Sequence, residues 1–208
     1  THSVICFVSF FLYITDCKTS IRNNIIQKDY NRLVEFFKMG HLPIILGPGQ
    51  VKIKIVHSVF KGENKEGDFN WMIEKPAYAK SLFIFNDNEK QFLAFVNDND
   101  PGAAGGGNAI IRPLQGASPP QAMGIPTGIL DPYQGYQKLE GDAKENIDKS
   151  IIILKNLLLS GNYNQVIISG DKVGKETLGT GLFDVNKDVK DYIVQQVKEV
   201  VKSANAKK

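Results

Sequence analysis

Residues 81–88 read SLFIFNDN, an almost wholly apolar run that gives way abruptly to polar residues. A short, continuous apolar run is typical of a strand covered on both faces, so residues 81–85 predict a central strand of a sheet. In open α/β sheets the ligand crevice lies beyond the carboxyl ends of such strands. Asn86, Asp87 and Asn88, which end the strand, are therefore candidates to hydrogen-bond a ribose or a base edge. The alternative interpretation is a plain Asx turn.

Further helices and strands accompany this strand in an order typical of α/β proteins. Residues 165–169 (QVIIS) predict a second buried strand, and residues 43–59 predict a hairpin around a Gly-Pro-Gly turn. Apolar residues at helical spacing predict helices over residues 21–39, 141–159 and 185–201. The succession of helix, strand, loop and helix predicts an α/β fold.

Length and composition fit one globular domain. The chain has 208 residues, of which 42% are hydrophobic and 23% charged, so it can bury a core without disulfides or a metal. Much of the excess positive charge lies in residues 18–38 and 187–208, so a central basic groove is not predicted and nucleic acid is not the expected partner. The cysteines, Cys6 and Cys17, and the three separated histidines form no zinc pattern, and no metal is expected.

The N-terminal segment contains an uncharged apolar run, residues 4–14, that is too short to span a bilayer as a helix. The run lacks the basic leading region and the cleavage site of a secretory signal. We interpret residues 1–20 as an apolar N-terminal extension whose origin the sequence leaves open. The expected location is the cytoplasm, without membrane association. The alternative is secretion, if residues 4–14 belong to a signal peptide.

Three consecutive glycines, Gly105, Gly106 and Gly107, are followed by Asn108 and an apolar Ala-Ile-Ile stretch. Glycines let backbone N–H groups approach a ligand closely, and a following helical turn adds its positive end, which together make an anion site. The loop suits a diphosphate. The alternative is a flexible linker, although the apolar residues that follow favour binding.

A second glycine turn, Gly179-Thr180-Gly181, lies between the strand at 165–169 and the last helix. A loop between a strand and a helix is a geometry that cradles phosphate. The alternative is a turn that starts the helix, with Asp184 or Asn186 as its N-cap.

The chain between residues 97 and 141 is rich in proline and predicts a long loop ordered by its own apolar anchors. Within it, residues 124–128 (GIPTG) predict a rigid turn, and the Thr127 hydroxyl is a candidate to face the ligand. A purely structural turn is the alternative.

The order of FIFNDN, GGGNAI and GTGLF resembles the macrodomain, the ADP-ribose-binding fold, over residues 81–201. The resemblance implies a three-layer α/β/α fold with a mixed central sheet. It also implies that Asn88 and Asn108 contact ribose and that Phe183 lies near the distal ribose. Residues 21–208 are then a single α/β nucleotide-binding domain.

The expected function is binding of ADP-ribose, or of another phosphate-bearing nucleotide, through the glycine-rich loops, with hydrolysis or sequestration of the ligand left open. A hydrolase acting on ADP-ribose derivatives or nucleotide phosphates would have Asp87 and Asn88 as its catalytic candidates. No cofactor is expected. The ligand-binding candidates are Asn86, Gly105, Gly106, Gly107, Asn108, Thr127, Gly179, Thr180, Gly181 and Phe183.

A different class of function is also consistent with the sequence. In this alternative the chain is a non-enzymatic interaction or inhibitor protein, and the proline-rich loop at residues 113–132 is the docking surface for a protein partner.

Overall fold

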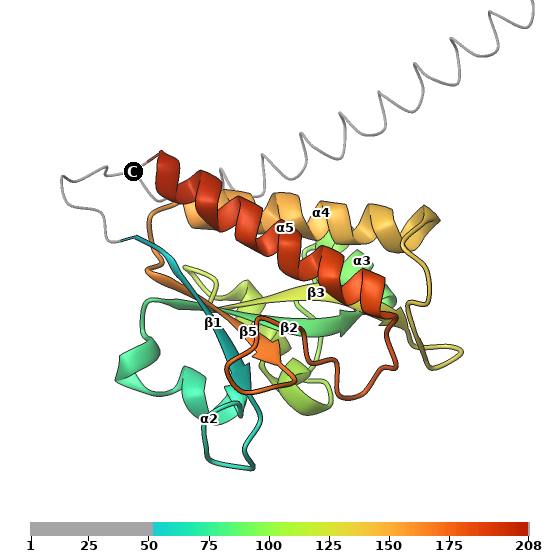
Figure 1. The fold of residues 1–208 in the computed structure, drawn as a ribbon, viewed down its shortest axis with the longest axis horizontal. Coiled ribbons are helices and arrows are strands. Elements are labelled where there is room, and N and C mark those ends of the chain that lie inside the picture. The colour runs from blue at the N-terminus through green and yellow to red at the C-terminus, as the bar shows by residue number, and fades with distance from the viewer. Residues whose placement is uncertain (1–51, 208) are drawn as a thin grey trace, which may run out of the picture. The chain divides into compact units, whose positions relative to one another are not determined.

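Five strands form one mixed, mostly parallel sheet in the computed structural model, which describes residues 52–207 (Figure 1). The strands are β1 (Lys54–Val59), β2 (Ser81–Asn88), β3 (Ala122–Ile129), β4 (Gln134–Gly135) and β5 (Gln165–Gly170). Their order across the sheet is β1-β5-β2-β3-β4, and within it only β3 and β4 pair antiparallel. The predicted N-terminal extension, the helix at 21–39 and the first half of the hairpin lie outside the described residues.

Strand β2 lies at the centre of the sheet, between β5 and β3, which confirms the prediction for residues 81–85. Its apolar side chains from Leu82 to Phe85 are each at most 2% exposed. The strand also runs three residues further than predicted, because Asn86, Asp87 and Asn88 continue the pairing with β3. These three polar residues therefore belong to the strand, and the Asx-turn alternative is wrong.

Helices flank the sheet, and Figure 1 shows α3, α4 and α5 on one side of it and α2 on the other. The α-helices are α2 (Phe69–Ile73), α3 (Glu89–Asp98), α4 (Gly141–Leu159) and α5 (Lys187–Ala206), with short 3-10 helices η1 (Pro76–Tyr78) and η2 (Gly107–Gly116). The prediction of a helix at 141–159 is confirmed. The last helix is confirmed too, although it extends to Ala206, and Asn186 is its N-cap, accepting from the Asp188 N–H.

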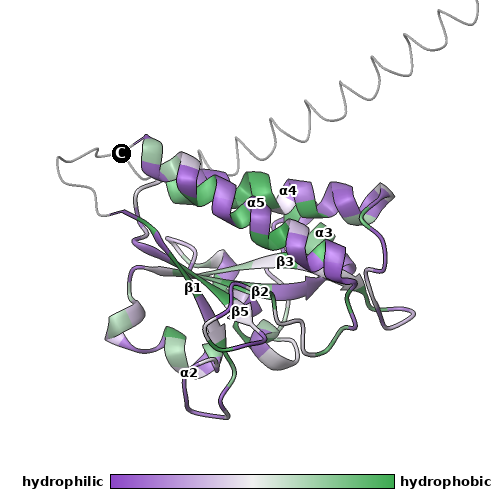
Figure 2. Cartoon of the chain, in the orientation of Figure 1, coloured by the Kyte–Doolittle hydropathy of each residue, from purple (hydrophilic) through white to green (hydrophobic). Residues whose placement is uncertain are grey.

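Helices α4 and α5 each bury one apolar stripe. In α4 the buried stripe includes Ile147 and Leu154, and in α5 it includes Val189 and Ile193, all four of which are completely buried. Figure 2 shows polar and apolar residues alternating along both helices, above apolar strands. This pattern is expected when one face of a helix packs on other elements and the opposite face meets water.

The proline-rich stretch after residue 97 is not one long loop, so that prediction is wrong. It contains η2 and the buried strand β3, in which residues 122–128 are all buried. Proline and glycine weaken strands, which is why Gly124, Pro126 and Gly128 suggested a turn. Pro126 is tolerated because β4 pairs only with Gly128 and Ile129, so that no strand among residues 52–207 pairs with the outer edge of β3 at Pro126.

Candidate functional site

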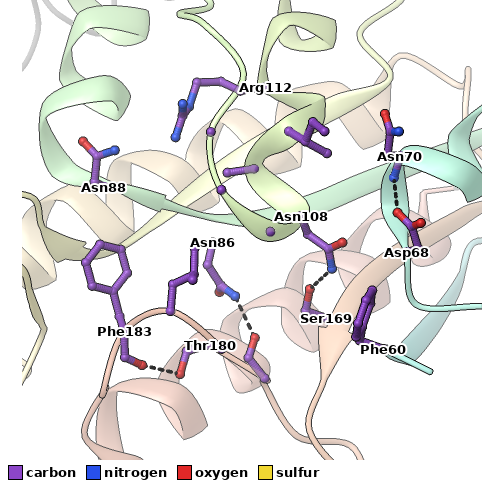
Figure 3. A pocket seen from close by; sticks show the side chains of 18 of the residues that line it. Phe60, Asp68, Asn70, Asn86, Asn88, Asn108, Arg112, Ser169, Thr180 and Phe183 are labelled. Atoms are coloured by element: carbon purple, nitrogen blue, oxygen red, sulfur yellow. Dashed lines mark hydrogen bonds between the residues drawn. The ribbon is translucent and has the colours of Figure 1, made fainter. Parts of the chain in front are cut away.

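The carboxyl ends of three parallel strands open into a pocket of about 1650 Å³. Ser58 at the end of β1, Asn86 and Asn88 at the end of β2, and Ser169 at the end of β5 all line it. Figure 3 shows this pocket with the side chains that surround it. This is the edge of the sheet at which α/β proteins usually bind their ligands.

Both glycine turns line this one pocket. Residues 105–107 form part of its wall, and so do residues 179–181. The two turns are close together, because a Cβ atom on Gly106 would lie 3.1 Å from Leu182 Cδ1, next to the second turn. Asn86 Nδ2 donates a 2.6 Å hydrogen bond to the Gly179 carbonyl and so ties the second turn to β2. The two turns thus meet at a common space.

Several backbone amides of these turns have no acceptor among the residues that the structure describes. The Gly105 N–H donates to the Ala109 carbonyl and the Gly179 N–H to the Ser169 carbonyl, each at 2.9 Å. Within residues 52–207, in contrast, no group accepts a hydrogen bond from the amides of Gly106, Gly107, Thr180 or Gly181. Unpaired N–H groups gathered around a pocket are suited to binding an anion.

One of the three consecutive glycines is favoured by the backbone conformation of the loop, and a second leaves space for the Arg112 side chain. Gly107 has a φ of +56°, in the left-handed region that favours glycine. A Cβ on Gly105 would lie 2.9 Å from each terminal nitrogen of Arg112. Gly106 has a φ of −76°, which any residue can adopt. Its lack of a side chain therefore matters for access to the pocket and not for backbone strain.

A buried ion pair fixes the first glycine turn to β2. Arg112 of η2 donates from Nε and Nη2 to Asp87 Oδ1, at 3.1 and 2.6 Å, and from Nη1 to the Ala103 carbonyl at 2.7 Å. The Asp87 side chain is completely buried. Burial raises the pKa of Asp87 above its usual range, against the opposing effects of the Arg112 hydrogen bonds and charge.

The predicted catalytic role of Asp87 does not fit this placement. Its carboxylate points into the protein, where Arg112 binds it, and Asp87 is absent from the described residues that line the pocket. Successive side chains of a strand point to opposite faces. Asn86 and Asn88 therefore face the pocket, while Asp87 between them faces the core.

Thr127 is also placed differently from the prediction. It is completely buried in β3, its hydroxyl donates to the Asp87 carbonyl at 3.5 Å, and it does not line the pocket. The expected turn that would have exposed the hydroxyl is a strand inside the sheet. Thr127 therefore belongs to the core.

The asparagines predicted to bind ribose line the pocket and are held by the protein. The Asn88 Oδ1 accepts from the Gln91 N–H at 3.0 Å and caps α3. The Asn108 Oδ1 accepts from the Phe69 N–H at 3.1 Å, and its Nδ2 donates to Ser169 Oγ at 2.9 Å. These bonds hold both side chains at the pocket wall.

Aromatic side chains complete the pocket at both ends. Phe183, predicted from the sequence, stacks on Tyr133 with ring centroids 4.7 Å apart. Phe60 lies beside Asp68, at the other side of the glycine turns (Figure 3). The sequence interpretation missed Phe60, Asp68 and Tyr133. The one available signal was that Phe60 directly follows a predicted strand.

Charged side chains at the pocket are mostly acidic. The acidic residues are Glu63, Asp68, Asp171 and Asp184, and the basic ones are Arg112 and Lys190. Since the Arg112 guanidinium already binds Asp87, Lys190 and the unpaired backbone amides are left as partners for an anion. Histidine and cysteine are missing from the described lining residues, and residues 52–207 hold no cluster of three or more potential metal ligands.

Comparison with protein-family models, curated proteins and solved structures finds no significant match to this chain. Between residues 52 and 207, no helix combines the length and apolar character needed to cross a membrane.

Proposed function

We propose that this pocket binds ADP-ribose or a closely related nucleotide, with the diphosphate held between the two glycine turns. One observation supports the proposal above all others: two turns about seventy residues apart in sequence line one pocket, and four of their amides have no protein acceptor among the described residues. Amide N–H groups of this kind are standard partners of phosphate oxygens.

The shape of the pocket fits a ligand with two arms. Phe60 and Asp68 lie to one side of the turns, and Phe183 and Asn88 lie to the other (Figure 3). A nucleotide base on the Phe60 side would stack on an exposed ring, and the distal ribose would lie at Phe183. We also propose that the fold is a macrodomain-like three-layer α/β/α arrangement.

The pocket favours a small diphosphate over a polyanion. Its acidic side chains outnumber its basic ones, so the repulsion grows with the charge of the ligand and is larger for a nucleic acid or a triphosphate than for a diphosphate. The alternative docking surface at residues 113–132 exposes fewer residues than expected, because residues 122–128 are buried in β3.

We propose that the pocket binds its ligand without hydrolysing it, since the Asp87 carboxylate is buried and bound by Arg112.

Isothermal titration calorimetry of the full 208-residue chain with ADP-ribose tests the proposal. We expect one molecule bound per chain, and markedly weaker binding of AMP and of ribose 5-phosphate, because each of these ligands fills only one arm of the pocket. Absence of heat at millimolar ADP-ribose would contradict the proposed function.

A further inference from the structure

The pocket end near Phe183 carries more aromatic surface than a ribose can use. Tyr133, from the connection between β3 and β4, stacks on Phe183 with an interplanar angle of 27° and is 57% exposed. Leu130 and Leu182 line the same pocket and are 47% and 55% exposed. Two segments fifty residues apart thus build one apolar platform.

Exposed apolar side chains are concentrated around this pocket. Among the residues that the structure describes, seven large hydrophobic side chains are exposed, and five of them line the pocket: Phe60, Ile110, Leu130, Tyr133 and Leu182. Scattered exposed apolar residues are ordinary, but a concentration at one cavity marks a binding surface. The apolar rim is therefore part of the site.

A planar aromatic group uses this platform better than a sugar does. Ribose is polar and binds through its hydroxyl groups, whereas a nucleobase stacks on aromatic rings. The pocket volume of about 1650 Å³ exceeds the range of roughly 300–1,000 Å³ that is usual for small-molecule sites, so it has room for a second ring.

We infer that the Tyr133–Phe183 platform binds a planar ring joined to the distal ribose, so that the preferred ligand is a dinucleoside diphosphate with a base at each end. This inference rests on the proposed function, because it takes the diphosphate to lie between the glycine turns. Phe60 then stacks on one base and Tyr133 stacks on the other.

The affinities of ADP-ribose and of P1,P2-di(adenosine-5′) diphosphate provide the test, since the second ligand adds an adenine to the distal ribose. Calorimetry should show the dinucleotide binding at least about five-fold more tightly, the lower end of what one stacked base contributes. Tyr133→Ala should remove this advantage, so that the ratio of the two affinities falls to about one. Tyr133→Phe should keep the advantage because the ring remains.

Val173→Ala is the matched control, since Val173 is an exposed apolar residue outside the pocket lining, and it should change neither affinity. If ADP-ribose binds and the dinucleotide binds no better, the platform assignment is wrong and the proposed function stands. The assignment is equally wrong if a folded Tyr133→Ala variant keeps the preference. If neither ligand binds, both the inference and the proposed function fail.

Discussion

Replacing Gly106 with valine will abolish nucleotide binding and leave the fold intact. The valine side chain would project toward Leu182, in the space between the two glycine turns. It would keep phosphate oxygens away from the amides of Gly106 and Gly107. Because the φ of Gly106 is −76°, valine fits the backbone there without strain. Loss of two charge-assisted hydrogen bonds, each worth about 1.5–3 kcal/mol, lowers the affinity at least about 100-fold.

Calorimetry with ADP-ribose measures this loss, and circular dichroism with thermal melting checks the fold. Ala117→Val is the matched control: Ala117 lies at the other end of η2 with a φ of −68°, and it does not line the pocket. That variant should bind ADP-ribose as the unmodified chain does. If Gly106→Val retains full affinity, the triple-glycine turn is not the phosphate site.

Replacing Arg112 with methionine will destabilise the domain by about 3–5 kcal/mol, because it leaves the buried Asp87 carboxylate without its partner. Urea unfolding measures the free-energy change. The first glycine turn loses its anchor as well, since Arg112 also holds the Ala103 carbonyl. Nucleotide affinity should fall together with stability.

Two further variants separate the ion pair from general damage to the core. Adding Asp87→Asn to Arg112→Met removes the unpaired charge and should restore much of the lost stability. Lys61→Met breaks an exposed pair with Glu66, in which both side chains are about half exposed, and should cost less than about 1 kcal/mol. If Arg112→Met also lowers the free energy of unfolding by less than about 1 kcal/mol, the buried ion pair does not hold the loop.

The sequence was a good guide wherever the apolar pattern was strong. The run at residues 81–85 and the stripe at 141–159 predicted β2 and α4, because burial of one face or of both faces leaves a clear periodicity. The last turn of α5 carries no such signal. It is held instead by Asn205, whose side chain hydrogen-bonds both the N–H and the carbonyl of Ile53 near the start of β1.

Strand β3 could not be predicted, because its glycines and its proline disguise a buried strand as a turn. The error with Thr127 follows directly from that. The error with Asp87 has a simpler origin: once residues 86–88 are taken as strand, alternation alone places Asp87 opposite to its neighbours.

The meeting of the two glycine turns was predictable in outline. One turn follows β5 and the other lies after β2 and α3, and these neighbouring parallel strands end at the same edge of the sheet. The aromatic pair of Tyr133 and Phe183 was not predictable, because it depends on how two irregular connections pack against each other.

Backbone amide NMR during titration with ADP-ribose tests most directly whether both turns hold one diphosphate. If they do, the amide signals of Gly106, Gly107, Thr180 and Gly181 will all move, and they will saturate at the same ligand concentration. Movement of one turn while the other stays unchanged, or movement confined to residues away from the pocket, would contradict a shared diphosphate site.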